Sequence, residues 1–280
     1  MPRFAGAPIV ASLRPPRADS PDMARIFITG SADGLGRMAA GLLVADGHDV
    51  VLHARNEARG RDAMQATPGA AGVVTGDLAT LAGMRAVAKA ANALGRFDAV
   101  IHNAAVGYRE PVRIETADGL PHVLAINSLA PYVLTALMER PARLVYVSSG
   151  LHRSGDASLR DLAWKARTWN GTQAYSDSKL HDVLLAFAIA RRWPGVGSNA
   201  IEPGWVATKM GGPGAPDDLS LGPRTQAWLA AGDDPKARVT GGYFYHQRPK
   251  DVLGAARSAD VQDRFITACE ALTGIALPPA

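Results

Sequence analysis

The chain has little of what metal, disulfide or membrane chemistry requires. Its single cysteine, Cys269, excludes an intramolecular disulfide and a cysteine-based metal site, and this usage fits a reducing cytoplasm. The seven histidines show no spacing typical of metal ligands, so we expect no metal. No apolar run approaches the ~18 residues that a membrane span needs, and the sequence therefore predicts no span.

Lysine is also scarce, because it makes up only six of the thirty basic residues. The net charge is +4 and the pI about 9.4, yet there is no long basic run and no stripe of basic and aromatic residues. Such patches are the usual footprint of nucleic-acid binding, which we therefore do not expect. The mild positive balance favours attraction of phosphate-bearing small molecules instead.

What is present suits one α/β domain. The 280 residues are 47% hydrophobic and 20% charged, which leaves ample material for a core. Five prolines interrupt residues 1–22, which we interpret as a flexible N-terminal extension. Residues 23–280 contain no linker that would divide them, so we expect a single domain there.

Strand-like and helix-like segments alternate from Arg25 onward. Strands are expected at 26–28, 49–53, 73–74, 98–102, 143–147, 197–201 and 241–246. Helices are expected at 35–45, 57–66, 80–94, 118–138, 173–192 and 260–273. Apolar strands that alternate with helices indicate a parallel sheet buried on both faces. With right-handed crossovers, the sequence predicts a doubly wound, Rossmann-like sheet with helices on both faces.

Residues 29–36, Thr-Gly-Ser-Ala-Asp-Gly-Leu-Gly, form a glycine-rich turn between the first strand and the first helix. Glycines permit positive φ and let the backbone approach a pyrophosphate, which the positive end of the helix dipole attracts. A plain strand-to-helix turn is the alternative interpretation. The candidate cofactor-binding residues here are Gly30, Ser31, Asp33, Gly34, Leu35 and Gly36.

The end of the second strand bears on cofactor choice. An NAD site usually has an acidic residue there, whereas this chain has Ala54 followed by Arg55. A guanidinium can pair with a 2′-phosphate, so NADP (NADPH) is favoured over NAD. A solvated Arg55 is the alternative, and Arg59 or Arg61 could serve equally well. Further cofactor-binding candidates, each with a simple turn or loop cap as its alternative, are Asp77, Leu78, Asn103, Ala104 and Ala105.

Residues that could carry chemistry follow the later strands. Ser148 and Ser149 close the fifth strand, where a hydroxyl can bond to a substrate oxygen. Tyr175 and Lys179 are four residues apart and share one helical face. A close ammonium would lower the pKa of the phenol and let it exchange a proton near neutral pH. After the sixth strand, the cofactor-binding candidates are Pro203, Gly204, Val206 and Thr208.

Over residues 24–210 the chain resembles the short-chain dehydrogenase/reductase family. The resemblance rests on Thr-Gly-x-x-x-Gly-x-Gly at 29–36, Asn-Ala-Ala at 103–105, Asn127, Ser-Ser at 148–149, Tyr-x-x-x-Lys at 175–179 and Pro-Gly at 203–204. It implies that Tyr175 is the acid/base and that Lys179 lowers its pKa and binds the nicotinamide ribose. Ser149 would position the substrate carbonyl, with Ser148 as the fallback, and Asn127 would anchor a water.

Two departures from the family pattern stand out. Ser149 and Tyr175 are 26 residues apart, which is a long gap for the family. That gap and the segment His-Ala-Arg-Asn at 53–56 are similar to the retinol-dehydrogenase-like branch, with its protochlorophyllide reductases and WW-domain oxidoreductases. That branch often acts on bulky apolar alcohols and aldehydes. Asp33 stands where some NADP-selective members have a basic residue, which leaves the cofactor preference resting on Arg55.

The expected activity is hydride transfer between nicotinamide and a carbonyl or alcohol of a hydrophobic small molecule. Substrate choice would depend on residues 150–172 and on a mobile loop at about 205–230. Candidate pocket walls are Trp205, Trp228 and Leu229, although plain core is the favoured interpretation of Trp228. The alternatives for the whole chain are a non-catalytic NADP-binding sensor or scaffold, and an epimerase or dehydratase. A homodimer or homotetramer through the two long helices is common in the family.

Overall fold

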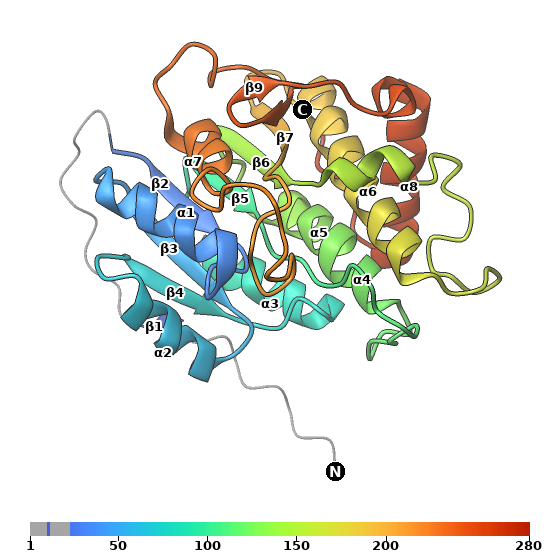
Figure 1. Cartoon of the computed structure of the whole chain (residues 1–280), viewed down its shortest axis with the longest axis horizontal. Coiled ribbons are helices and arrows are strands. Elements are labelled where there is room, and N and C mark those ends of the chain that lie inside the picture. The colour runs from blue at the N-terminus through green and yellow to red at the C-terminus, as the bar shows by residue number, and fades with distance from the viewer. Residues whose placement is uncertain (1–9, 12–22) are drawn as a thin grey trace.

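The computed structural model describes residues 10–11 and 23–280. In this part of the chain, one nine-stranded sheet has the order β1-β4-β3-β2-β5-β6-β7-β8-β9 (Figure 1). The strands are β1 Val10–Ala11, β2 Arg25–Ile28, β3 Asp49–Ala54, β4 Gly72–Thr75, β5 Ala99–His102, β6 Arg143–Val147, β7 Gly197–Glu202, β8 Tyr243–Tyr245 and β9 Arg248–Pro249. The pairs from β4 to β8 are parallel, and β1 and β9 add short antiparallel edges. The predicted doubly wound α/β sheet is confirmed.

Helices cover both faces of the sheet (Figure 1). They are α1 Gly34–Ala45, α2 Glu57–Ala66, α3 Leu81–Asn92, α4 His122–Leu124, α5 Ala130–Leu137, α6 Gly171–Arg192, α7 Arg224–Ala231 and α8 Ala259–Thr273. Helices α1, α2 and α7 pack on one apolar core, and α3, α5, α6 and α8 on the other. Strand residues such as Ile26 and Val51 are wholly buried, as expected for strands between two helical layers.

Polar caps decide where several helices begin. The side chains of Asp33, Asn56, Thr80, Asn170 and Ser258 accept hydrogen bonds from backbone amides in the first turns of α1, α2, α3, α6 and α8. These short polar side chains satisfy donors that the helix itself leaves without partners. The sequence therefore sets the position of α1, which brings its N-terminus to the glycine-rich turn.

The expected helix 118–138 differs from what forms. Pro121 is the N-cap, α4 starts at His122, and a π-helical turn, Ala125–Leu129, separates α4 from α5. Residues 116–119 form a turn instead, closed by a bridge between Glu115 and Pro121. Proline cannot donate the amide hydrogen that a helix interior needs, so the helix begins after it. Helix α7 was not predicted.

The chain buries its own long helix α6. Every residue from Ala174 to Ile189 is buried, because α6 packs between the sheet and α8. Phe265 of α8 stacks on His181 with ring centroids 4.7 Å apart. The Trp193 indole donates to the backbone oxygen of Pro278 at 3.0 Å, which holds the C-terminal segment across the end of α6. The helix face that the family resemblance assigns to dimerisation is thus covered from within.

Of the expected flexible extension 1–22, only Val10–Ala11 lie inside the described residues, where they pair with Val73 and Val74 of β4. The remaining residues of the extension lie outside the described part. Among the helices of residues 23–280, none has both the length and the apolar character needed to cross a membrane.

Candidate active site

The glycine-rich turn lies at the carboxyl edge of the sheet, between β2 and α1. Gly30 has φ +64°, and a Cβ there would lie 2.7 Å from the Cα of Ala104. A Cβ on Gly36 would lie 2.4 Å from Nδ2 of Asn103, which itself donates to the backbone oxygens of Thr29 and Gly30 at 3.0 and 3.2 Å. The turn therefore needs glycine at both positions, and Asn103 ties neighbouring backbone groups together as predicted.

His53, at the end of β3, fixes the turn from the other side. Its Nδ1 accepts a hydrogen bond from the Gly30 amide at 3.0 Å, and its Nε2 lies 3.0 Å from the Gly76 oxygen. The Ser31 hydroxyl donates to the Ile28 oxygen and accepts from the His53 amide. Ser31 is thus buried and links the ends of β2 and β3 by hydrogen bonds. It does not line the cleft beside the turn.

A cleft of about 730 Å³ opens beside this turn, a volume that suits a nucleotide. Most of the sequence-predicted cofactor residues line it: Gly30, Asp33, Gly34, Leu35, Arg55, Asp77, Leu78, Asn103, Ala104, Ala105, Tyr175, Lys179, Pro203 and Thr208. Ser31, Gly36, Gly204 and Val206 do not line it. The structure therefore brings the glycine-rich turn, Tyr175 and Lys179 to the same cavity.

The arginines near this cleft differ in how they are held. The Arg59 guanidinium donates to the Ala32 oxygen at 3.3 Å and lies 3.5 Å from the Asp33 carboxylate, so part of its hydrogen-bonding capacity is already used within the protein. Arg55 is exposed at the cleft, and no hydrogen bond or ion pair joins its side chain to another described residue. Asp33 also pairs with Lys209 across the cleft, and the hydrogen bond from Lys209 lowers the pKa of that carboxyl.

Tyr175 and Lys179 lie on α6 below the glycine-rich turn and are both buried. The Lys179 ammonium lies 5.6 Å from the centre of the Tyr175 ring. It donates to the Val147 oxygen at 2.8 Å and to Asp182 Oδ2 at 2.9 Å. Burial alone would lower the pKa of Lys179, but the charge of Asp182 raises it above its usual value. Lys179 therefore stays charged at neutral pH.

The predicted lowering of the tyrosine pKa is wrong for this structure. Burial raises the pKa of Tyr175 above its usual value, which outweighs the lowering effect of Lys179 and of the Ser149 hydroxyl. The Asp182 charge works in the same direction as burial. The spacing of Tyr175 and Lys179 indicated their proximity correctly, but spacing alone could not reveal a second charge beside the ammonium.

The two serines after β6 have different surroundings. The Ser148 hydroxyl is buried and donates to the Lys179 oxygen at 2.7 Å, so it holds α6 against the sheet. Ser149 caps the short 3-10 turn Gly150–Ser154 and lines a cavity together with Tyr175. Ser149 is therefore better placed than Ser148 to meet a substrate oxygen.

Asn127 lies in the π-helical turn and joins three segments. Its Oδ1 accepts from the Val106 amide at 2.8 Å, and its Nδ2 donates to the Val106 oxygen at 3.0 Å and to Ser178 Oγ at 3.1 Å. The side chain thus fixes the loop after β5 to α6. The water-anchoring role expected for Asn127 stays a prediction.

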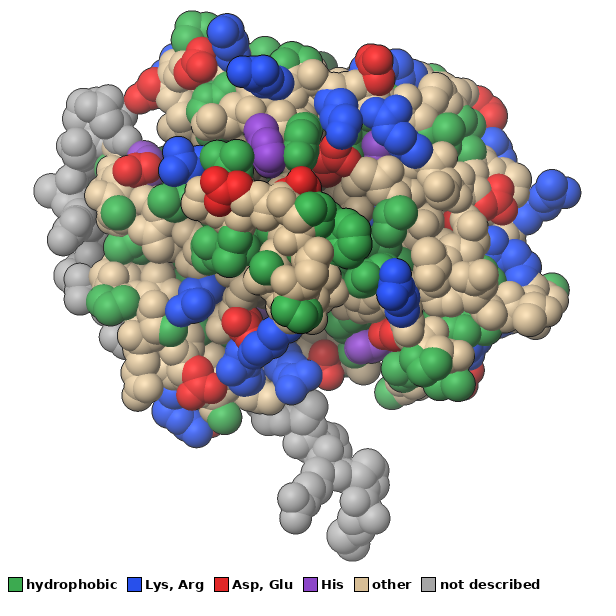
Figure 2. Space-filling model, in the orientation of Figure 1, with side chains coloured by type: hydrophobic (Ala, Val, Ile, Leu, Met, Phe, Trp, Pro, Cys, Tyr) green, Lys and Arg blue, Asp and Glu red, His purple; other side chains and the backbone are tan. Residues whose placement is uncertain are grey.

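A second cavity, of about 530 Å³, meets the first at Tyr175, Ser148, Pro203, Thr208 and Met210. Its partly exposed apolar walls include Leu151, Trp205 and Met210, and apolar side chains gather near the middle of this face (Figure 2). Trp205 is the pocket wall that the sequence predicted. Trp228 packs edge-on against Phe244 and belongs to the core with Leu229, so neither lines the cavity.

The loop after β7 reaches both cavities. Gly204 has φ +88°, and a Cβ there would lie 2.7 Å from Asp217 Oδ2, so glycine makes room for this carboxylate. Asp217 accepts from the Trp205 amide at 2.6 Å, which holds the indole at the cavity mouth. The sulfur of Met210 lies 3.8 Å from the Tyr175 hydroxyl. The loop predicted at 205–230 therefore does contact Tyr175.

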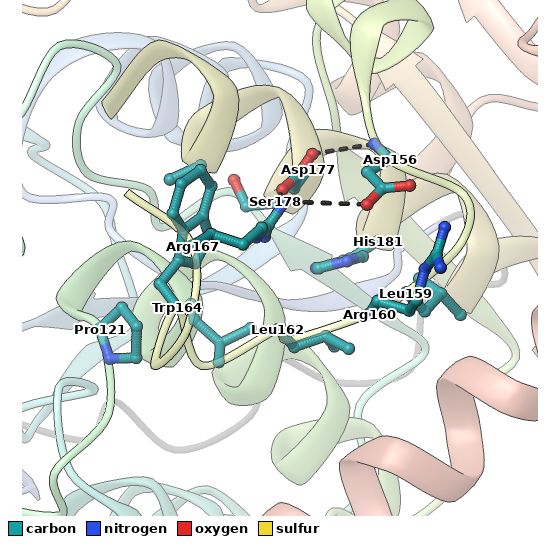
Figure 3. A pocket seen from close by; sticks show the side chains of 12 residues that line it. Pro121, Asp156, Leu159, Arg160, Leu162, Trp164, Arg167, Asp177, Ser178 and His181 are labelled. Atoms are coloured by element: carbon teal, nitrogen blue, oxygen red, sulfur yellow. Dashed lines mark hydrogen bonds and ion pairs between the residues drawn. The ribbon is translucent and has the colours of Figure 1, made fainter. Parts of the chain in front are cut away.

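Most of the insert 150–172 packs away from the second cavity, whose lining includes only Gly150 and Leu151 from it. Arg167 donates to Asp177 Oδ2 at 3.0 Å, and the Asp156 amide donates to Asp177 Oδ1 at 2.9 Å (Figure 3). These contacts close a small polar pocket of about 10 Å³ beside His181, room for about one water. Of the insert, the first two residues are thus the part that lines the second cavity.

Several residues at the site were not singled out from the sequence. Tyr108 lies against Tyr175 with ring centroids 5.8 Å apart, and the Met210 sulfur contacts the Tyr175 hydroxyl. Glu202 and Lys250 form an ion pair in the wall of the second cavity. Asp182 follows Lys179 by three residues, and that helical spacing was the one available signal.

The residues present fit a dinucleotide cofactor. Gly30 and Gly34 of the glycine-rich turn line the cleft without side chains, and the N-terminus of α1 lies beside them. Arg55 and Lys179 line the same cleft, while Tyr175 lies where the two cavities meet. A molecule held in the cleft would therefore run from Arg55 to the phenol of Tyr175.

Comparison with known proteins agrees with this geometry. Residues 24–159 match the family model described as short chain dehydrogenase. An uncharacterized oxidoreductase of Emericella nidulans is 44% identical, over 91% of this chain and 99% of that protein. The short-chain dehydrogenase chyC of Penicillium rubens is also 44% identical, over 91% of this chain and all of that protein.

More distant relatives cover the same region. Human retinol dehydrogenase 14 is 33% identical over 75% of this chain and 69% of its own length. A crystal structure of a protein from Mycobacterium paratuberculosis matches with a TM-score of 0.78 at 26% identity, over 91% of this chain and 95% of that chain.

Proposed function

Because the chain belongs to the short-chain dehydrogenase/reductase family, in its retinol-dehydrogenase-like branch, we propose that it is an NADP-dependent reductase of hydrophobic carbonyl compounds. The family acts on CH–OH and C=O groups, and the two fungal relatives quoted above are named an oxidoreductase and a dehydrogenase. One observation carries the proposal: Tyr175 lines both cavities, with Ser149 beside it in the second and Lys179 beside it in the first.

The chain's own residues supply proton transfer and orientation. The bound dinucleotide would supply the hydride. Ser149 donates a hydrogen bond to the substrate carbonyl oxygen and holds it near the Tyr175 phenol. Tyr175 gives its proton to that oxygen as the carbonyl carbon becomes an alcohol carbon. Lys179, charged and held by Val147 and Asp182, balances the phenolate that remains.

The preference for NADP rests on Arg55. Its guanidinium is exposed at the cleft and is not engaged by another described side chain, whereas Arg59 is already bonded to Ala32 and Asp33. A free guanidinium can form a forked, charge-assisted contact with a 2′-phosphate. The Asp33 carboxylate would oppose that phosphate, but its pairing with Lys209 offsets its charge.

The hydrophobic substrate rests on the walls of the second cavity. Tyr108, Leu151, Trp205 and Met210 present apolar surface in this cavity, which Tyr175 also lines. Each buried CH₂ group of a substrate would gain about 0.8 kcal/mol there. Bulky apolar aldehydes and ketones therefore fit better than small polar ones.

We also propose that any dimer uses a surface other than α5 and α6, since α8 and the C-terminal segment cover α6 within the chain. A cytoplasmic location is supported by the use of a single cysteine.

Consumption of NADPH with a panel of aldehydes and ketones tests the proposed function. Turnover of apolar carbonyls supports it. NADPH binding without turnover would favour the sensor or scaffold alternative, and conversion of a sugar-like substrate without net NADPH consumption would favour an epimerase or dehydratase.

A further inference from the structure

Asp182 is a buried acid that the proposed chemistry does not use. Only 2% of its side chain is exposed, and its Oδ2 accepts from Lys179 Nζ at 2.9 Å. Such a pair is costly to bury unless both ions are well bonded. The Lys179 ammonium meets this need, because it also donates to the Val147 oxygen at 2.8 Å. Two of its three hydrogens are therefore fixed by the protein.

We propose that Asp182 is a positioning residue that holds Lys179 against β6 and, by its charge, keeps Tyr175 in its protonated, proton-donating form. The inference rests on the proposed function, since it concerns how the same site handles its proton. A lone ammonium beside a phenol stabilises the phenolate. A carboxylate bonded to that ammonium cancels much of this effect, and Tyr175 then serves better as an acid than as a base.

The surroundings of the pair support this assignment. Tyr146 of β6 interacts electrostatically with Asp182, and His102 of β5 stacks on Tyr146. Tyr108, from the loop after β5, is the further titratable group beside the Tyr175 ring. Burial raises the pKa of Tyr146 and lowers that of His102, so both are uncharged at neutral pH. Asp182 and Lys179 are thus the charges that act on Tyr175 from within α6.

The pKa of Asp182 is raised by burial to about 6, against the lowering effect of Lys179. Its charge is therefore present above that pH, which includes the alkaline range in which Tyr175 would ionise. A residue cannot change the equilibrium constant of the overall reaction. The effect of Asp182 therefore appears in the midpoint pH at which oxidation rises. Oxidation, which needs the phenolate, should rise only at alkaline pH, and reduction should persist into that range.

The test compares wild type with Asp182→Asn, which keeps the shape and removes the charge. The alkaline rise of oxidation kcat/KM, and the ionisation of Tyr175, should both move to lower pH by about one unit, the scale on which a nearby unit charge acts. The ionisation is read without turnover, as the tyrosinate absorbance of each protein minus that of its Tyr175→Phe counterpart. NADPH affinity should change by less than about threefold.

Asp177→Asn is the matched control, because Asp177 is a buried acid of α6 that pairs with Arg167. It should leave both midpoints in place. Asp182→Ser, which leaves room for a water beside the ammonium, serves if Asp182→Asn does not fold. Midpoints in a folded Asp182 variant that stay in place, or that move to higher pH because Lys179 loses its charge without Asp182, would overturn the proposal. Failure of both variants to fold would assign Asp182 a structural role only. If the wild type turns over no carbonyl but Asp182→Asn still moves the Tyr175 ionisation to lower pH, the proposed function is refuted and this inference stands.

Discussion

The Gly30 amide donates a hydrogen bond to Nδ1 of His53 at 3.0 Å, which joins the glycine-rich turn to the end of β3. Because Nδ1 accepts here, His53 is uncharged, and its Nε2 carries the hydrogen that faces the Gly76 oxygen. Protonation of Nδ1 would remove the acceptor and break the link. The cofactor end of the site therefore depends on a neutral histidine.

We expect the protein to lose stability in mild acid. Burial lowers the pKa of His53 from 6.5 to about 4, and those of His102 and His181 fall to about 3 and about 4. Below pH 6.5 these histidines bind protons in the unfolded chain but not in the folded chain. The unfolding free energy therefore falls from that pH down to about 4. His53 alone should contribute about 3 kcal/mol to this loss.

Urea unfolding at several pH values measures the acid effect. His53→Asn should flatten the fall in unfolding free energy between pH 6.5 and 4, whereas His48→Asn, at a partly exposed histidine, should keep it. An unfolding free energy that stays level across this range would contradict the neutral state of the buried histidines.

Arg55→Asp should shift the enzyme toward NADH. Loss of a charge-assisted contact, with a carboxylate in its place, should lower kcat/KM for NADPH about 10- to 100-fold. Steady-state kinetics with both cofactors measures the ratio. Arg61→Asp is the control, because Arg61 is exposed and pairs with Glu57. Equal ratios in wild type and Arg55→Asp would mean that Arg55 is only a solvated side chain.

Trp205→Ala should select against bulky substrates. The indole, held by its hydrogen bond to the Gly211 oxygen at 2.8 Å, forms a wall of the second cavity. Loss of that apolar contact should raise KM for a bulky apolar aldehyde about tenfold, while a small aldehyde that does not reach the wall keeps its KM. A change of the same size for both substrates would argue against Trp205 as a substrate contact.

Phe265→Ala should destabilise the cover over α6. Phe265 is fully buried and stacks on His181, so its truncation should cost about 3–5 kcal/mol of unfolding free energy. Thr267→Ala, at an exposed position of the same helix, should change it by less than about 0.5 kcal/mol. Urea unfolding compares the two, and a similar small loss in both would mean that α8 contributes little.

The sequence predicted most of the fold because the strands are short apolar runs and the turns carry glycine. Ile26–Ile28 and Val50–Leu52 can only be buried, and Asp33 caps α1 where the turn ends. The π-helical turn around Asn127 and the helix α7 were not predicted, since tertiary contacts rather than local propensity decide them.

The site was predictable to the extent that motifs carry it. Tyr175 does lie between the other two motif residues, since it lines both cavities, while Lys179 lines the first and Ser149 the second. The charge balance was not predictable, because it depends on burial and on Asp182, which no motif marked. The favoured core position of Trp228 is confirmed, although its partner Phe244, from a distant strand, could not be named from the sequence.

The central claim is that Tyr175 donates the proton in NADPH-dependent carbonyl reduction. The most direct test measures NADPH consumption with apolar aldehydes and ketones by wild type and by Tyr175→Phe, with NADPH binding measured in parallel. The account predicts turnover by wild type, and in Tyr175→Phe a rate below a tenth of it with binding largely intact. A variant that keeps more than a tenth of the wild-type rate would contradict the assignment of Tyr175 as the acid.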